Sequence, residues 1–113
     1  MLFRSTDRAT VAAANAAVAH CPGSNLKLAS GALNWKQWHS DGIRVGIGTD
    51  GCSSSNDLDM WQAIRLSGLL ARLTSGEPDT TPAIEVLRGA TIEGARALGL
   101  GDLIGSEIGR AHV

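Results

Sequence analysis

The sequence is poor in aromatic residues and cysteine, and it carries no excess of charge. Its 113 residues contain no tyrosine, one phenylalanine and two cysteines, and the formal net charge is -1. Proteins that bind nucleic acid or anionic membranes usually present a strongly basic surface, which this composition does not supply. We therefore expect neither nucleic acid nor a membrane as a partner.

Long hydrophobic runs are missing as well. No segment approaches the roughly 18 to 20 uninterrupted apolar residues of a membrane span, and the opening MLFRSTDRAT lacks the apolar core of a signal peptide. A cytoplasmic setting is the expectation. The two cysteines, Cys21 and Cys52, are not in CxxC spacing, so the sequence favours reduced thiols over a zinc knuckle or a disulfide scaffold.

What is present is an alternation of helix and strand patterns in a chain that is 43% hydrophobic. Helix–strand alternation predicts an α/β fold with parallel strands, but two strands alone do not complete such a sheet. The chain is therefore expected to be a slice of a larger α/β protein. The predicted helices span 6–14, 32–40, 57–73, 82–90 and 92–98, the strands span 16–21 and 43–50, and loops occupy 23–31 and 51–56.

The stretch VGIGTDG, residues 45–51, fits two different chemistries. Gly46, Gly48 and Gly51 satisfy the G-x-G-x-x-G pattern of a dinucleotide-binding unit. That pattern requires a helix at the third glycine and an acidic residue about 20 positions later. Here the next long helix is expected only near Asp57. About 20 positions beyond the motif lie residues 70–72, Leu-Ala-Arg, with no acid until Glu77, so dinucleotide binding is the less favoured alternative.

The second interpretation of this stretch concerns Asp50, at the carboxyl end of the predicted strand. Barrel and open-sheet enzymes place functional side chains at this end of their strands. A carboxylate there can ligate a cation and can accept a proton from a water molecule that the cation has acidified.

Several segments together point to a family. The order AHCPGSNLKLASG, VGIGTDGCSSSNDLDMW, AIRLSGLLARL and ATIEGARALGLGDLIGS resembles the C-terminal part of the catalytic barrel of the amidohydrolase superfamily. Within this superfamily, the sequence is similar to the branch that contains methylthioadenosine/S-adenosylhomocysteine deaminases, guanine deaminases and triazine chlorohydrolases. It covers nearly the whole chain, from about residue 6 to residue 106.

The resemblance implies a partial TIM (β/α)8 barrel, strands seven and eight with flanking helices. It implies that Asp50 is both a metal ligand and a catalytic residue, which carries a proton from the attacking water to the leaving group. The expected cofactor is a divalent metal, zinc or else iron, and the expected substrate is a small purine-like or related heterocycle. The family's metal-binding histidines lie on other strands, and no His-x-His pair occurs here. A homo-oligomer is left open.

His20 and Asn25 are the other candidate site residues. His20 is the next-to-last residue of the predicted strand 16–21, and Asn25 follows the Pro22-Gly23 turn. Either side chain could contact substrate, and either could instead serve the local structure, which is the favoured interpretation for His20 as well as for Asn25 and its neighbour Ser24. Ser54 and Asp57, beyond Asp50, could orient that carboxylate or cap the next helix, and for Asp57 capping is favoured.

Residues 1–107 are therefore expected to be a C-terminal fragment of an amidohydrolase barrel, inactive without the remaining ligands. A non-catalytic, vestigial binding element is a further alternative. Residues 108–113, IGRAHV, can be encoded by ATC GGA AGA GCA CAC GTC, which is similar to a common short-read sequencing adapter. We expect these six residues to be a non-native tail.

Overall fold

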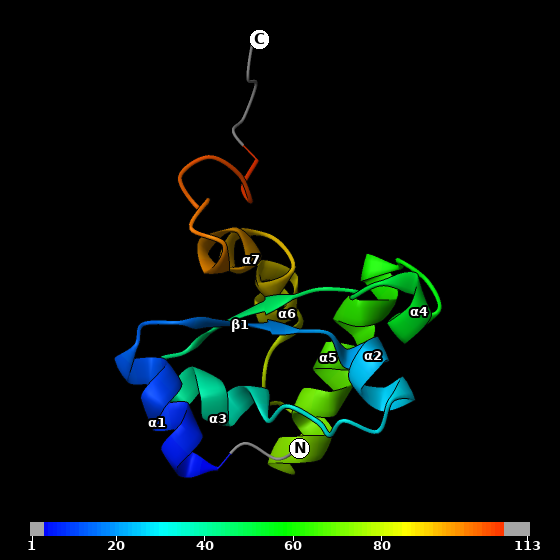
Figure 1. Ribbon diagram of the computed structural model, residues 1–113, viewed down its shortest axis with the longest axis horizontal. Coiled ribbons are helices and arrows are strands. Elements are labelled where there is room, and N and C mark those ends of the chain that lie inside the picture. Colours follow the sequence, from blue (N-terminus) through cyan, green and yellow to red (C-terminus); the bar gives the residue numbers. More distant parts are fainter. Residues whose placement is uncertain (1–3, 108–113) are drawn as a thin grey trace, which may run out of the picture.

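The computed structural model of the chain describes residues 4–107, so the tail expected over residues 108–113 lies outside the described part. The fold combines helices with a small parallel sheet, as the sequence predicts (Figure 1). The elements in chain order are α1 (Ser5–Ala13), β1 (Ala17–His20), α2 (Pro22–Lys27), α3 (Trp35–Ser40), β2 (Arg44–Ile47), α4 (Cys52–Ser55), α5 (Met60–Ser75), α6 (Ala83–Gly89) and α7 (Ile92–Ala97).

The two strands pair in parallel, and His20 lies opposite Ile47 at their carboxyl ends. This arrangement confirms the parallel pairing expected from the order of elements. The Gly48 N–H donates to the His20 carbonyl at 3.0 Å and extends the ladder by one bond. Segments that follow the two strands therefore emerge at the same edge of the sheet.

Helices cover both faces of the sheet. In Figure 1, α7 lies on one side of the strands, and α1, α3 and α5 lie on the other. The hydrophobic core forms between the strands and α3, α5 and α6, where burying apolar side chains stabilises the fold. Its buried members are Trp35, Trp38, Ile43, Val45, Ile47, Ala63, Ala71 and Val86.

Two short helices replace loops expected from the sequence. The loop prediction for residues 23–31 was wrong for its first part, because Pro22 occupies the first turn of α2, where its missing N–H costs nothing. The loop prediction for residues 51–56 was also wrong, since α4 occupies 52–55 and ends at Asn56 in a left-handed conformation, φ 77°. Helices this short depend on tertiary contacts, and local sequence preference carries little information about them.

The N-cap of helix α5 lies two residues after the expected one. The Asp59 carboxylate accepts the Gln62 N–H at 3.0 Å and is the true N-cap, so the assignment of that role to Asp57 was wrong. Asp57 instead accepts the Asp59 N–H at 3.2 Å. The packed face of α5 consists mostly of small residues, since its buried members are Ala63, Ser67, Gly68, Leu70 and Ala71. Two other leucines, Leu69 and Leu73, are 53% and 76% exposed.

Within residues 4–107, none of the helices combines the length and the apolar character that crossing a membrane requires.

Candidate functional site

Asp50 stands three residues beyond β2 and bears the most unusual backbone of the predicted site. Its φ is 61°, in the left-handed region that non-glycine residues adopt rarely. The carboxylate Oδ1 accepts the Gly51 N–H at 2.8 Å, and the Thr49 hydroxyl donates to the Asp50 carbonyl at 3.0 Å. The side chain is exposed and is held in place by its own turn.

Hydrogen bonds keep Asp50 ionised. The Ser24 hydroxyl contributes most to holding the pKa of the Asp50 carboxyl below its usual value, followed by the Gly51 N–H, with a smaller contribution from the Ser54 hydroxyl. Each donor stabilises the charged form. Ser24 belongs to α2 and Ser54 to α4, so each of the two short helices that follow the strands contributes a hydroxyl that stabilises the same carboxylate.

Cys21, which directly follows β1, lies close enough to Asp50 to interact with its charge. Burial raises the pKa of the Cys21 thiol, the negative charge of Asp50 raises it further, and a hydrogen bond from the Asp50 backbone works in the opposite direction. A Cβ at position 48 would lie 3.2 Å from the Cys21 sulfur, closer than most real contacts of a Cβ. Gly48 therefore lets the sulfur approach the strand end, and the thiol stays protonated and unsuited to nucleophilic attack.

His20 and Asn25 line one cavity of about 500 Å³, together with residues of α1 and α3. His20 is only 2% exposed, its Nδ1 has no hydrogen-bond partner, and its ring meets Trp35 edge to face at 6.3 Å. Burial lowers the pKa of His20 to about 4. The structure thus brings together the two predicted substrate contacts, but Asp50 is not among the residues that line this cavity.

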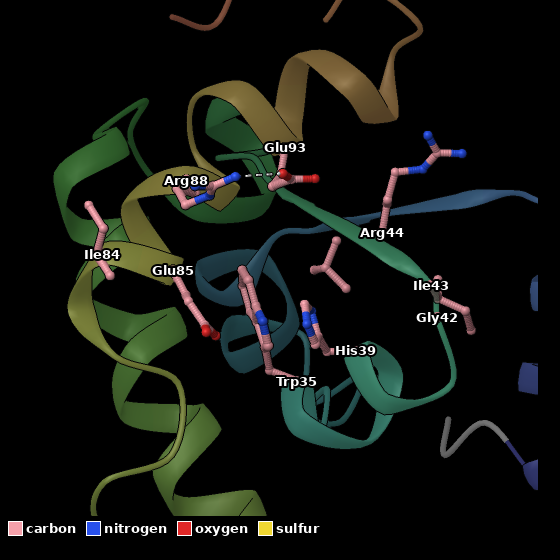
Figure 2. A pocket seen from close by; sticks show the side chains of 10 residues that line it. Trp35, His39, Gly42, Ile43, Arg44, Ile84, Glu85, Arg88 and Glu93 are labelled. Carbon is pink, nitrogen blue, oxygen red and sulfur yellow. Dashed lines mark hydrogen bonds and ion pairs between the residues drawn. The ribbon is translucent and has the colours of Figure 1, made fainter.

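A second cavity, of about 550 Å³, lies at the other end of β2 (Figure 2). Trp35, Ile43 and Val45 are among its apolar walls, while His39 and Glu85 lie around the same space. Arg88 pairs with Glu93 at its edge, 3.4 Å apart. Because this cavity borders the amino end of β2 and Asp50 follows the carboxyl end, the two features are separate.

Asp50 fits the role of one oxygen ligand for a divalent cation, since its carboxylate is exposed and kept ionised. Across residues 4–107, however, no three histidine, cysteine or acidic side chains gather closely enough to hold a metal ion. Catalytic zinc sites use three or more protein ligands. The described part of the chain thus offers at most a fraction of a metal site.

Comparison with known proteins identifies the class. Residues 1–109 match the amidohydrolase family, and the chain belongs to that family. Within it, the chain is 53% identical over 89 residues to the 5-methylthioadenosine/S-adenosylhomocysteine deaminase of Moorella thermoacetica, covering 79% of this chain and 21% of that protein. It is 45% identical over 82 residues to the 5'-deoxyadenosine deaminase of Methanosarcina acetivorans, covering 73% and 20%.

Solved structures agree with these sequence matches. A zinc-bound adenosine deaminase from Xanthomonas campestris superposes with a TM-score of 0.88 at 41% identity, over 97% of this chain and 25% of that one. Guanine deaminase from E. coli gives 0.83 at 30% identity, over 94% and 24%. The resemblance predicted from the sequence is confirmed, and the α/β chain matches about a quarter of neighbours that have the amidohydrolase barrel fold. It spans about a fifth of the length of the curated relatives it matches.

The comparisons and the local geometry do not favour dinucleotide binding. Gly46 faces α7, because a Cβ there would lie 3.1 Å from the Gly94 Cα. The helix after Gly51 has four residues, too short for the helix whose amino end holds a pyrophosphate. The glycines of this stretch thus serve close packing and the turn at Asp50.

Proposed function

We propose that the chain forms strands seven and eight of a metal-dependent amidohydrolase barrel that hydrolytically deaminates a purine-like heterocycle. In this proposal β1 and β2 are the two strands, and Asp50 is both a ligand of the metal and the residue that carries the proton. The observation behind the proposal is the Asp50 carboxylate itself: exposed, ionised and fixed by donors from two loops at the carboxyl end of a strand.

The names of the relatives support the substrate class. The similar proteins include deaminases of adenosine-type compounds and of guanine as well as triazine hydrolases, and two of the solved structures hold zinc. The likeness to the adenosine deaminase covers 97% of this chain. Zinc is accordingly the proposed cofactor, and it would supply Lewis-acid activation of the attacking water.

Asp50 can perform the proton transfers of this reaction. Ionised at neutral pH, the carboxylate accepts the proton that the attacking water releases and then donates it to the departing amine. Ser24 and the Gly51 N–H keep the carboxylate charged and oriented between these transfers. His20 and Asn25 are proposed to act on the substrate side, where the cavity that they share with α3 would have to open toward the reacting ring.

A chimaera tests the proposal. Residues 4–107 replace the matching segment of the Moorella thermoacetica deaminase, and ammonia release from methylthioadenosine and adenosine is measured together with zinc content. We expect an active, zinc-bearing enzyme whose Asp50→Asn variant loses about 10²–10⁴-fold in kcat, because asparagine keeps the shape but cannot carry the proton.

Asp57→Asn is the matched control, since the Asp57 carboxylate lies in the same segment between β2 and α5 but accepts the Asp59 N–H at the start of α5. It should retain activity within a few-fold. Full activity in the Asp50→Asn chimaera would contradict the assignment. A folded chimaera without zinc or turnover would favour a non-catalytic role for the segment.

A further inference from the structure

Lys27 connects the two short helices on either side of Asp50. Its Nζ donates to the Ser53 carbonyl at 2.8 Å and to the Asn56 Oδ1 at 2.6 Å. Lys27 is the last residue of α2, whereas Ser53 lies within α4 and Asn56 caps its end. The bond therefore joins segments that follow different strands and are 26 residues apart in sequence.

Neither helix is long enough to hold its position alone. Helices α2 and α4 have six and four residues, far below the roughly 12–15 at which isolated helices become marginally stable. They pack against each other, and a Cβ at Gly23 would lie 3.7 Å from the Ser55 Cβ. Among the residues that the structure describes, the hydrogen bonds between the two helices come from Lys27.

The same two helices carry Ser24 and Ser54, the two hydroxyls that help to hold the pKa of the Asp50 carboxyl below its usual value. Ser24 lies three residues before Lys27, so the two side chains project from neighbouring positions of α2. Ser54 directly follows Ser53, whose carbonyl accepts from Lys27. Both helices thus act on the Asp50 carboxylate, and the hydrogen bonds of the Lys27 ammonium join them directly.

We propose that Lys27 is a positioning residue for Asp50: its ammonium clamps α4 to α2 and so fixes the hydroxyls of Ser24 and Ser54 around the carboxylate. The inference rests on the proposed role of Asp50 for its functional meaning. The clamp itself is a structural property of this chain. The acceptors of Lys27 are a main-chain carbonyl and an amide oxygen at the end of α4, so the bond holds one defined segment.

Amide hydrogen exchange in the 113-residue chain tests the clamp. The Ser54, Ser55 and Asn56 N–H groups donate within α4 to Gly51 and Cys52 carbonyls and report its closure. In Lys27→Met, which keeps the aliphatic stem, we expect these three amides to exchange about fivefold faster or more, because a charged hydrogen-bond donor is lost. The ¹³C shift of the Asp50 carboxyl at neutral pH should change with them.

Two variants supply the controls. Lys27→Arg can reach the same acceptors and should restore both the exchange rates and the carboxyl shift. Lys36→Met removes another exposed lysine, one that pairs with Glu77 far from α4 in sequence, and should leave both readouts unchanged. Unchanged exchange in Lys27→Met, or an acceleration that Lys36→Met reproduces, would overturn the proposal.

The chimaera separates this inference from the proposed function. If Lys27→Met speeds exchange but the unmodified chimaera is inactive, the clamp stands and the catalytic assignment fails. If the chimaera is active and Lys27→Met alters neither exchange nor kcat, the clamp fails alone. A working clamp lowers kcat in Lys27→Met while KM stays close to the unmodified value.

Discussion

His20 places an imidazole in the interior of the sheet with its Nδ1 unpartnered, and this makes stability depend on pH. Burial lowers the pKa to about 4 in the folded chain, against 6.5 for the free side chain. At pH values between these two pKa values, His20 is protonated in the unfolded chain and neutral in the folded chain. The stability tied to neutral His20 is therefore complete above pH 6.5 and is lost as pH falls toward 4.

We predict that the free energy of unfolding drops by about 1 kcal/mol between pH 7.5 and pH 5.5 because of His20. Urea denaturation at the two pH values measures it. His20→Gln should flatten the dependence, and His39→Gln, which changes an exposed histidine of α3, should preserve it. If His20→Gln does not fold, NMR of the parent chain provides the answer, since a His20 ring protonated at pH 5.5 would refute the prediction.

At the residue scale, the sequence indicates Asp50 because a carboxylate at a strand end has a recognisable context. It does not reveal which side chains meet that carboxylate. The sequence offers an orienting role for Ser54 only as an alternative, and it favours a local structural role for Ser24. Both hydroxyls in fact help to lower the pKa of the Asp50 carboxyl. Lys27 carried no signal at all, because its acceptors lie 26 and 29 residues away on a helix that the sequence did not predict.

At the scale of elements, α7 packs on the sheet through facing glycines. A Cβ at position 46 would lie 3.1 Å from the Gly94 Cα and 3.5 Å from the Ala97 Cβ. We predict that Gly46→Ala pushes α7 away and costs about 1–3 kcal/mol, because backbone atoms cannot yield as a flexible side chain can. Gly51→Ala is the matched control, with nothing within 4 Å and an ordinary φ of -76°, and should change stability by less than about 0.5 kcal/mol. Chemical denaturation of both variants checks the difference, and equal losses would contradict it.

The start of α5 offers a second prediction about an element. Asp59→Ala should destabilise the fold by about 1 kcal/mol, because the Gln62 N–H loses its cap. Asp57→Ala removes a longer bond at 3.2 Å and should cost less than about 0.5 kcal/mol. Thermal unfolding compares the two variants. A larger loss of stability in Asp57→Ala would support Asp57 as the N-cap, as expected from the sequence.

The elements show where sequence patterns succeed and where they stop. The strands and the longer helices have β-branched runs or caps that local preference detects, and their order gave the parallel pairing. Helices α2 and α4 escaped prediction since their stability comes from each other and from Lys27. The helix predicted over residues 57–73 is confirmed as α5, but small residues such as Ser67 and Gly68 form much of its buried face, which the sequence pattern does not reveal.

For the whole molecule, large apolar side chains remain on the surface of the described residues. Trp61, Leu69 and Leu73 on α5 are 73%, 53% and 76% exposed, whereas Trp35 and Trp38 are each only 4% exposed. Patches of this kind in soluble proteins mark contacts with other protein surfaces. The relatives, about five times longer than the matched segment, have further chain that could form such contacts.

We predict that acrylamide quenches one of the three tryptophans in the isolated chain and leaves the other two protected. Trp61→Phe should abolish the quenchable fraction, since Trp61 is the exposed ring. In the chimaera or at high protein concentration, shielding of Trp61 would show that its surface is an interface. Strong quenching that persists in Trp61→Phe would mean that the core around α3 opens in solution.

The left-handed turn at Asp50 has a consequence for how this segment can change by mutation. An aspartate at φ 61° is held in a conformation that glycine adopts without penalty and that costs other residues about 1–2 kcal/mol. Selection for folding alone would then drive position 50 toward glycine, whereas selection for turnover would forbid it. A library sorted only for solubility should become enriched in Asp50→Gly, and the persistence of the acid would record a function that outweighs its cost to the fold.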